Sequence, residues 1–161
     1  MNMEIERKFL VKNDSWKTDD LHGEACRQGY LFANEKKTVR VRQIGEKGFL
    51  TIKGETLGIS RKEFEYEIPF EDASALLLLC GDFLIEKRRY KINYANMLWE
   101  VDLFLGENEG LVLAEIELES EGQSFVLPPW VGKEVSNDFR YFNAQLARHP
   151  FRELSLSECN Q

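Results

Sequence analysis

The chain has 161 residues, 43% of them hydrophobic and 30% charged, which is enough apolar material for one domain with a packed core. Its 28 acidic and 21 basic residues give a formal net charge of -7, which disfavours nucleic acid as a partner, because proteins that neutralise phosphates carry a basic balance. No apolar run reaches the roughly 18 residues of a membrane-spanning helix and no secretory leader opens the chain, so we expect a soluble, cytoplasmic protein with no membrane partner.

Apolar and polar residues alternate with period two along most of the chain. This alternation predicts β-strands that each have one polar and one apolar face. The predicted strands cover residues 3–11, 24–32, 37–43, 48–53, 61–68, 84–92, 98–104 and 111–120. Turn-forming sequences at 45–48, 93–96 and 106–110 separate several of them. Many strands joined by short turns favour an antiparallel barrel or a strongly curved sheet, within the α+β class but mainly β.

Three helices are predicted beside the strands. The first is a short helix over residues 14–21. The second covers residues 72–80, with Asp72 as its N-terminal cap and Gly81 as its C-terminal stop. The third runs over residues 138–148, next to the C-terminal tail. These few helices are expected to pack on the outside of the barrel.

Charged side chains of one sign share a face on most of the predicted strands. The pairs are Glu4 and Glu6, Arg40 and Arg42, Glu63 and Glu65, Lys87 and Arg89, Glu100 and Asp102, and Glu115 and Glu117; Lys8 shares the first face and Lys53 lies on the polar face of the fourth strand. Each face taken alone is typical of a solvated sheet surface. Taken together they are unusual, because like charges side by side repel by up to about 1 kcal/mol a pair. We infer that groups of opposite charge lie between these faces.

A barrel whose apolar faces point outward would have a tunnel lined by these charges, the inverse of the usual small barrel. Guanidinium and ammonium groups in the tunnel would suit a chain of phosphates. The carboxylates would repel that anion unless a divalent cation bridged them to the phosphate oxygens. The chain has two histidines and no C-x-x-C pair, so the ligands would be carboxylates and the metal Mg²⁺ or Mn²⁺.

Several motifs in one order then point to a family. They are the E-x-E-x-K sequence at residues 4–8, Arg40-Val41-Arg42, Lys53, the charged run 61–65, the basic run 87–90, Glu100-Val101-Asp102, Glu115-Ile116-Glu117, and the tail from 134 to 143. With these motifs the chain resembles the CYTH family, also called triphosphate tunnel metalloenzymes, over residues 3–146. It is most similar to the short bacterial members that act on inorganic tripolyphosphate.

The resemblance implies a single domain over residues 1–148, an eight-stranded antiparallel tunnel, and a role for each charged residue; we expect residues 149–161 to form a poorly ordered tail. It assigns metal binding to Glu4, Glu6, Glu115 and Glu117, phosphate binding to Lys8, Arg40, Arg42, Lys53, Lys87 and Arg89, and support of the basic groups to Glu63, Glu65, Glu100 and Asp102. Glu6 would lie at the metal that activates water. Lys8 is the candidate proton acceptor and Tyr30 its candidate assistant, although Lys8 fits phosphate binding alone and Tyr30 fits simple packing.

The expected function is metal-dependent hydrolysis of inorganic tripolyphosphate to pyrophosphate and phosphate. A class IV adenylyl cyclase or a thiamine triphosphatase on the same scaffold is the alternative, in which Trp16, Phe32 or Trp130 would stack on an organic group. A polyphosphate- or nucleotide-binding module without turnover is the alternative of a different class, and the intact carboxylate pairs disfavour it. A homodimer is also expected to be accessible, because a barrel with charges inside exposes apolar surface outside.

Overall fold

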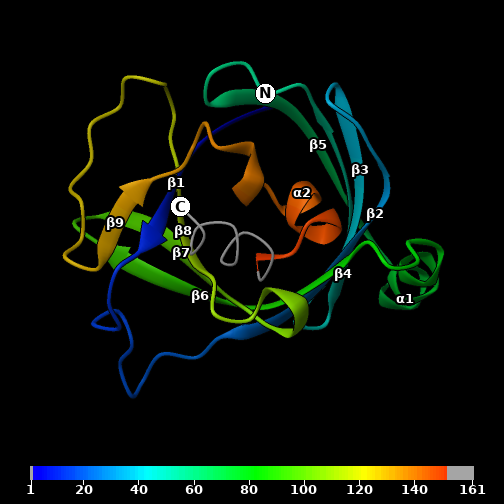
Figure 1. The fold of residues 1–161 in the computed structure, drawn as a ribbon, viewed down its shortest axis with the longest axis horizontal. Coiled ribbons are helices and arrows are strands. Elements are labelled where there is room, and N and C mark those ends of the chain that lie inside the picture. The colour runs from blue at the N-terminus through cyan, green and yellow to red at the C-terminus, as the bar shows by residue number, and fades with distance from the viewer. Residues whose placement is uncertain (1, 152–161) are drawn as a thin grey trace, which may run out of the picture.

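Eight antiparallel strands close into a barrel in the computed structural model of the chain, which describes residues 2–151 (Figure 1). The strands are β1 (Met3–Val11), β2 (Glu24–Ala33), β3 (Lys37–Ile44), β4 (Lys47–Gly54), β5 (Ser60–Ile68), β6 (Leu84–Tyr94), β7 (Met97–Phe104) and β8 (Val112–Glu117), with a ninth, β9 (Val131–Glu134), outside the ring. The helices are α1 (Phe70–Leu79), α2 (Asn143–Arg148) and the 3₁₀ turns η1 (Gly106–Asn108) and η2 (Phe139–Tyr141). No helix among the described residues is long and apolar enough to cross a membrane.

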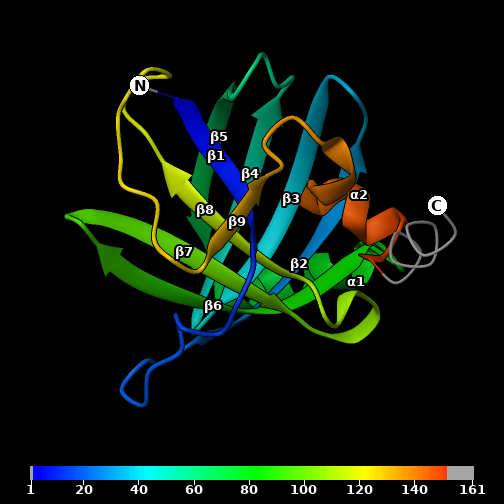
Figure 2. The same ribbon diagram turned by 60° about the vertical axis from the view of Figure 1, so that its left-hand side comes forward.

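The strand order around the barrel places β1 and β2 on opposite walls. The order is β5-β4-β3-β2-β6-β7-β8-β1, and pairing of β1 with β5 closes the ring. Counted in either direction, β2 is the fourth strand from β1. Only the start of β1 pairs with β5, and its end pairs instead with β9 (Figure 2). Glu4 lies opposite Arg61 in the first pairing, and Phe9 lies opposite Glu134 in the second.

All eight predicted strands are confirmed, but β9 was not predicted. Its four residues include Gly132 and show no alternation of apolar and polar side chains. The predicted helix over 14–21 is wrong, because the segment forms turns. The side chain of Asn13 accepts hydrogen bonds from the backbone and hydroxyl of Ser15, which gives this polar segment a local alternative to helical hydrogen bonds.

The other two predicted helices form with different boundaries. Helix α1 starts at Phe70, directly after Pro69, so Asp72 lies in its first turn and is not the cap. The predicted stop is confirmed at Gly81, whose φ of +60° is a conformation that glycine adopts without strain. The C-terminal helix is split into η2 and α2, because Phe142 between them is extended.

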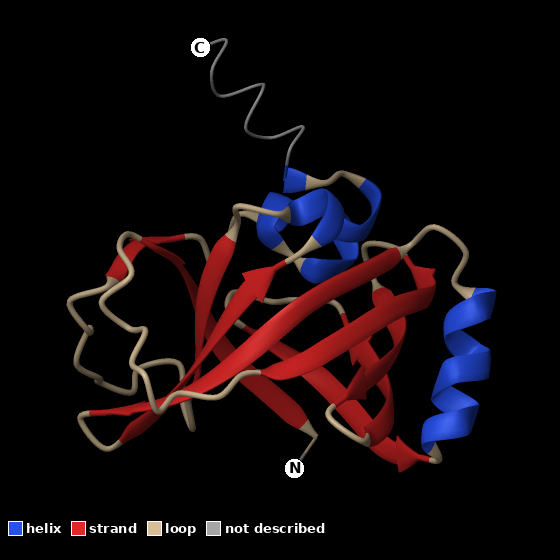
Figure 3. Ribbon diagram, turned by 90° about the horizontal axis from the view of Figure 1, so that it is seen from below, coloured by secondary structure: helices blue, strands red, loops and turns tan. Residues whose placement is uncertain are grey.

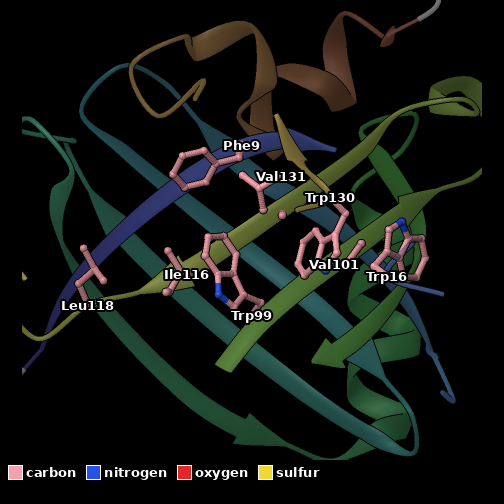
Figure 4. Packing of buried hydrophobic residues seen from close by; sticks show 9 residues of the cluster. Phe9, Trp16, Trp99, Val101, Ile116, Leu118, Trp130 and Val131 are labelled. Atoms are coloured by element: carbon pink, nitrogen blue, oxygen red, sulfur yellow. The ribbon is translucent and has the colours of Figure 1, made fainter. Parts of the chain in front are cut away.

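The apolar faces of β1, β7 and β8 point outward, as predicted, and pack under non-helical segments as well as under β9. The Trp99 ring contacts Phe9 of β1 and Trp130 from a covering segment. Ile116 and Trp16 belong to the same buried cluster (Figure 4). Side chains in this cluster are nearly solvent-free, and burial of one large aromatic or aliphatic side chain contributes about 1.5–3 kcal/mol. This outer core buries the outer face of the wall, while the inner face carries charges.

A second apolar cluster closes one end of the lumen. Ile85, Phe104 and Leu113 lie on the lumen faces of β6, β7 and β8, and they pack against Tyr141 of η2 and Leu146 of α2. Figure 3 shows η2 and α2 at one end of the barrel and α1 alongside its wall. The lumen is therefore a cup, with an apolar floor at one end and charged walls above it.

Candidate active site

The charged faces of the strands line one cavity of about 1070 Å³ inside the barrel. The predicted site residues that line it are Glu4, Glu6, Lys8, Tyr30, Arg40, Arg42, Lys53, Glu63, Glu65, Arg89, Glu100, Glu115 and Glu117. Two predicted residues, Lys87 and Asp102, are buried behind the cavity surface instead. The period-two pattern correctly predicts that these charges share the inner face of the barrel. It does not predict which of them reach the cavity surface and which are buried behind it.

Glu6, Glu115 and Glu117 form what we call the acidic wall, on β1 and β8. Glu6 lies opposite Glu117 in the strand register, and Glu115 lies opposite Lys8. Burial, with repulsion from Glu115 and Glu4, raises the pKa of Glu6 to about 8. Burial, with repulsion from Glu4 and Glu100, also raises the pKa of Glu117. The surroundings therefore disfavour the ionised form of both carboxyls, and a cation beside them would stabilise that form.

Glu4, beside the acidic wall, is held by cations. The Lys53 ammonium lies 3.1 Å from a Glu4 oxygen and 3.3 Å from a Glu63 oxygen, and Arg61 Nε lies 3.4 Å from Glu4. Burial raises the pKa of the Glu4 carboxyl, but the attraction of Lys53 and Arg61, together with hydrogen bonds, outweighs it and the pKa falls below its usual value. Burial, together with a hydrogen bond to Glu4, raises the pKa of Glu63 to about 7.

Asp102 organises a compact ion cluster near the floor. Lys87 Nζ and Arg89 Nε each lie 2.8 Å from an Asp102 oxygen, and Arg89 also lies 3.2 Å from Glu100 and 3.6 Å from Glu115. Burial raises the pKa of the Asp102 carboxyl, but Arg89 and Lys87 outweigh it and the pKa is lowered. The Lys87 side chain is fully buried, so its predicted contact with phosphate stays a prediction.

Arg40 and Arg42 of β3, with Gln28 of β2, form the basic wall on the opposite side. Arg40 lies 3.5 Å from Glu65 and 3.3 Å from the Thr51 hydroxyl, and its Nε is buried without a hydrogen-bond partner in the described chain. Arg42 has no carboxylate partner within residues 2–151, and its one hydrogen bond there runs from Nε to Gln28 Oε1 at 3.0 Å. Burial lowers the pKa of Arg42, with repulsion from Arg40 and Arg89 adding to it. This wall has donors left for an anion.

Lys8 and Tyr30, the predicted proton-transfer pair, are not joined by a hydrogen bond in the described structure. Lys8 Nζ donates to the Tyr141 carbonyl at 3.2 Å and lies 3.7 Å from Glu115. The Tyr30 hydroxyl accepts from Gln28 Nε2 at 3.4 Å on the other side of the lumen. Any cooperation between them would need the substrate or water between them.

Among residues 2–151 no group of three or more His, Cys, Asp or Glu side chains is arranged to hold a metal ion. The ion pairs described above explain this, because Glu4 and Glu115 each contact two cations. The donors nevertheless fit a hard divalent cation, since Glu6 and Glu117 offer carboxyl oxygens whose ionised form is on balance disfavoured by burial and by neighbouring carboxylates. A cation between the walls would stabilise that form.

Sequence reasoning missed three residues that contact predicted site residues. Gln28 is fully buried against Arg42, Arg61 lines the cavity beside Glu4, and Asn143 accepts a hydrogen bond from Lys87. Alternation could have placed Gln28 on the same face as Cys26 and Tyr30. Arg61 belongs to the alternating charged face of its strand. The Asn143 contact spans 56 residues of sequence and has no local signal.

Comparison with known proteins agrees with this geometry. The profile of the CYTH domain matches residues 2–151 of the chain. The chain belongs to the CYTH family. Two relatives are named inorganic triphosphatase. One from Acetivibrio thermocellus is 50% identical, over 94% of this chain and 97% of the relative. One from Nitrosomonas europaea is 40% identical, over 89% of this chain and 96% of the relative. A crystal structure of an inorganic triphosphatase superposes with a TM-score of 0.65 at 38% identity, covering 89% of this chain and 93% of that chain.

Proposed function

We propose that this CYTH protein hydrolyses inorganic triphosphate to pyrophosphate and phosphate inside its barrel, with Mg²⁺ or Mn²⁺. The observation that carries the proposal is that one cavity faces two kinds of unsatisfied group. The acidic wall has carboxyls whose ionised form lacks a stabilising cation, and the basic wall has a guanidinium without a carboxylate partner in residues 2–151. The relatives that are 50% and 40% identical bear the name of this activity. A polyanion that bridges a divalent cation and guanidinium groups satisfies both walls at once.

The basic side chains would bind and orient the phosphate chain. Arg42 presents terminal nitrogens with no partner in the described structure, so it can bind phosphate oxygens through its fork. Arg40, Lys53 and Arg89 line the same cavity and would contact other phosphates. Phosphoryl transfer depends mostly on positioning and on charge stabilisation, which these groups supply. Lys87 would act through the field of its buried ammonium.

Glu6, Glu115 and Glu117 would hold the metal, with Glu4 beside them. When bound, a divalent cation polarises phosphate oxygens and water. Glu6 would orient the attacking water from the acidic wall. Lys8 is the candidate acceptor of the proton that this water loses, a role that requires its neutral amine form. The Tyr30 hydroxyl would donate to the phosphate chain from the opposite wall.

The cyclase and thiamine triphosphatase alternatives require an aromatic side chain that can stack on an organic group at the cavity, and the three predicted candidates do not lie there. Trp16 and Trp130 are buried in the outer core, and Phe32 is exposed but does not line the cavity. A cytoplasmic location and the absence of membrane and nucleic-acid partners stay predictions. So does a homodimer, for which the exposed Leu78 and Leu79 of α1 offer apolar surface.

The test is phosphate release from tripolyphosphate, ATP and thiamine triphosphate, each with Mg²⁺, with Mn²⁺ and with chelator. We expect release mainly from tripolyphosphate, only with metal, and strongly reduced in Glu115→Gln. Formation of cyclic AMP from ATP, or faster release from thiamine triphosphate, would replace the proposed substrate. Tight binding of tripolyphosphate without release would overturn the enzymatic function.

A further inference from the structure

The lumen face of β2 is uncharged between Cys26 and Tyr30, whereas β3 and β6 on either side of it carry cations there. Its side chains are Cys26, Gln28 and Tyr30, and they lie between the cations of β3 and β6. Gln28 is directly opposite Arg42 in the β2–β3 register and has no solvent exposure. A buried amide needs its hydrogen bonds satisfied, so its partners show what it does.

The Gln28 amide uses all four of its hydrogen-bonding positions. Oε1 accepts from Arg42 Nε at 3.0 Å and from Cys26 Sγ at 3.6 Å. Nε2 donates to Tyr30 at 3.4 Å and to Asn143 Oδ1 at 3.2 Å. Because a guanidinium can only donate, the oxygen end of the amide must face Arg42. The amide therefore has one orientation, and it fixes Arg42 by its Nε.

The hydrogen-bond chain continues across the floor of the lumen. Asn143 Oδ1 accepts from Lys87 Nζ at 2.9 Å as well as from Gln28. Two neutral amides thus connect Arg42 on β3 to Lys87 on β6. Chains of this kind hold side chains in one arrangement when every member is satisfied.

A neutral partner has a consequence for Arg42 that a carboxylate would not have. The other predicted phosphate ligands each lie within 3.7 Å of a carboxylate oxygen: Lys8, Arg40, Lys53, Lys87 and Arg89. Arg42 is oriented without being neutralised, and its terminal nitrogens have no partner within residues 2–151. The cavity therefore keeps one full, pre-oriented positive charge for an anion.

We propose that Gln28 is a positioning residue of the triphosphatase, which fixes the Arg42 guanidinium for phosphate binding while leaving its charge intact. The inference rests on the proposed function, because it takes phosphate as the ligand of Arg42. It predicts that Gln28 acts on substrate only through Arg42, so the effects of substituting the two residues must not add.

The experiment compares Gln28→Met, Arg42→Met and the double variant by steady-state hydrolysis of tripolyphosphate. Methionine keeps the length of the glutamine side chain and removes its acceptor. We expect Gln28→Met to lower kcat/KM about 10- to 100-fold, mainly through KM, as expected for loss of a hydrogen bond to a charged group. In the Arg42→Met background the same change should cost less than about threefold. Equal effects in both backgrounds would overturn the proposal.

Gln28→Glu separates positioning from charge. It keeps the shape and the oxygen that faces Arg42, gives up the Nε2 hydrogen bonds to Tyr30 and Asn143, and gives Arg42 a carboxylate partner. We expect the protein to stay folded and KM to rise about tenfold or more. A wild-type kcat/KM in Gln28→Glu would also overturn the proposal. If Gln28→Met fails to fold, the Gln28→Glu variant is the test of the positioning role. Gln43→Met is the matched control, because the Gln43 amide contacts Phe70 and Ser74 of α1 outside the lumen.

Binding measurements distinguish failure of this inference from failure of the proposed function. Calorimetric titration of each variant with tripolyphosphate reports Arg42 binding even where no phosphate is released. If Gln28→Met weakens tripolyphosphate binding in the wild-type background but has no further effect on binding in the Arg42→Met background, the positioning role is supported even without turnover. Unchanged binding in Gln28→Met would refute it whatever the activity.

Discussion

The lumen has two opposite walls, one formed by β1 and β8 and the other by β2 and β3. On the first, Glu6 and Glu117 repel their neighbours, and on the second, Arg42 has no carboxylate partner in the described chain. Between them near the floor, Asp102 is fully engaged by Lys87 and Arg89. The difference teaches that a charged residue has a structural role when oppositely charged neighbours pair with it, as at Asp102. A charged residue without such a partner, such as Arg42, can bind a ligand.

Breaking the compensated cluster should have the largest effect on stability. Asp102→Asn removes a buried charge and leaves Lys87 and Arg89 without their shared partner, so we expect the free energy of unfolding to fall by about 3–5 kcal/mol. Urea unfolding measures it. The matched control is Glu86→Gln, which breaks the exposed pair with Arg27 and should cost less than about 1 kcal/mol. Equal losses in both variants would mean that the cluster is not a structural ion group.

Neutralising the uncompensated acidic wall should do the opposite. Glu117→Gln removes a proposed metal ligand, and metal-dependent phosphate release should fall at least about 100-fold, since even supporting groups of metal sites cost 10–100-fold. The unfolding free energy should not fall, because repulsion within the wall is relieved. Glu119→Gln, two residues further along the chain and outside the cavity, is the control for both measurements. A loss of stability with retained activity would reverse the roles of the two regions.

The smallest expected effect is the response of Asp102 to acid. Because the pKa of Asp102 is lower in the folded protein than the unfolded value of about 3.9, its contribution is complete above that pH and is lost as pH falls further. Between about pH 5 and about pH 2.5, the unfolding free energy of Asp102→Asn should therefore change by about 1–2 kcal/mol less than that of wild type. Parallel curves for the two proteins would contradict the compensated state of Asp102.

Much of the fold could be predicted from the sequence because successive side chains of a strand point to opposite faces of the sheet, so that each face repeats every two residues. The same rule put Glu4, Glu6 and Lys8 on one face, and all three line the cavity. The rule does not say whether a side chain on the inner face reaches the cavity surface. It therefore predicts the same position for Lys87 and Arg89, although Arg89 lines the cavity and Lys87 is buried behind its surface.

The missing parts of the prediction depend on contacts between distant segments. Strand β5 pairs only with the start of β1, so the edge of β1 near Phe9 and Val11 is left for β9 to pair with. No local sequence pattern encodes this pairing. Gln28 and Asn143 are 115 residues apart, and their hydrogen bond exists only once α2 has packed on the floor. The segment 14–21 was expected to be helical, yet burial of Trp16 in the outer core and local polar hydrogen bonds favour turns.

In the proposed complex the acidic wall binds a divalent cation and the basic wall binds the phosphate chain. A crystal structure with Mn²⁺ and tripolyphosphate, located by the anomalous signal of manganese, tests it most directly. We predict Mn²⁺ on oxygens of Glu6, Glu115 and Glu117, with phosphate oxygens on the terminal nitrogens of Arg42. Phosphate bound away from Arg42, or manganese bound away from these three carboxylates, would contradict the account.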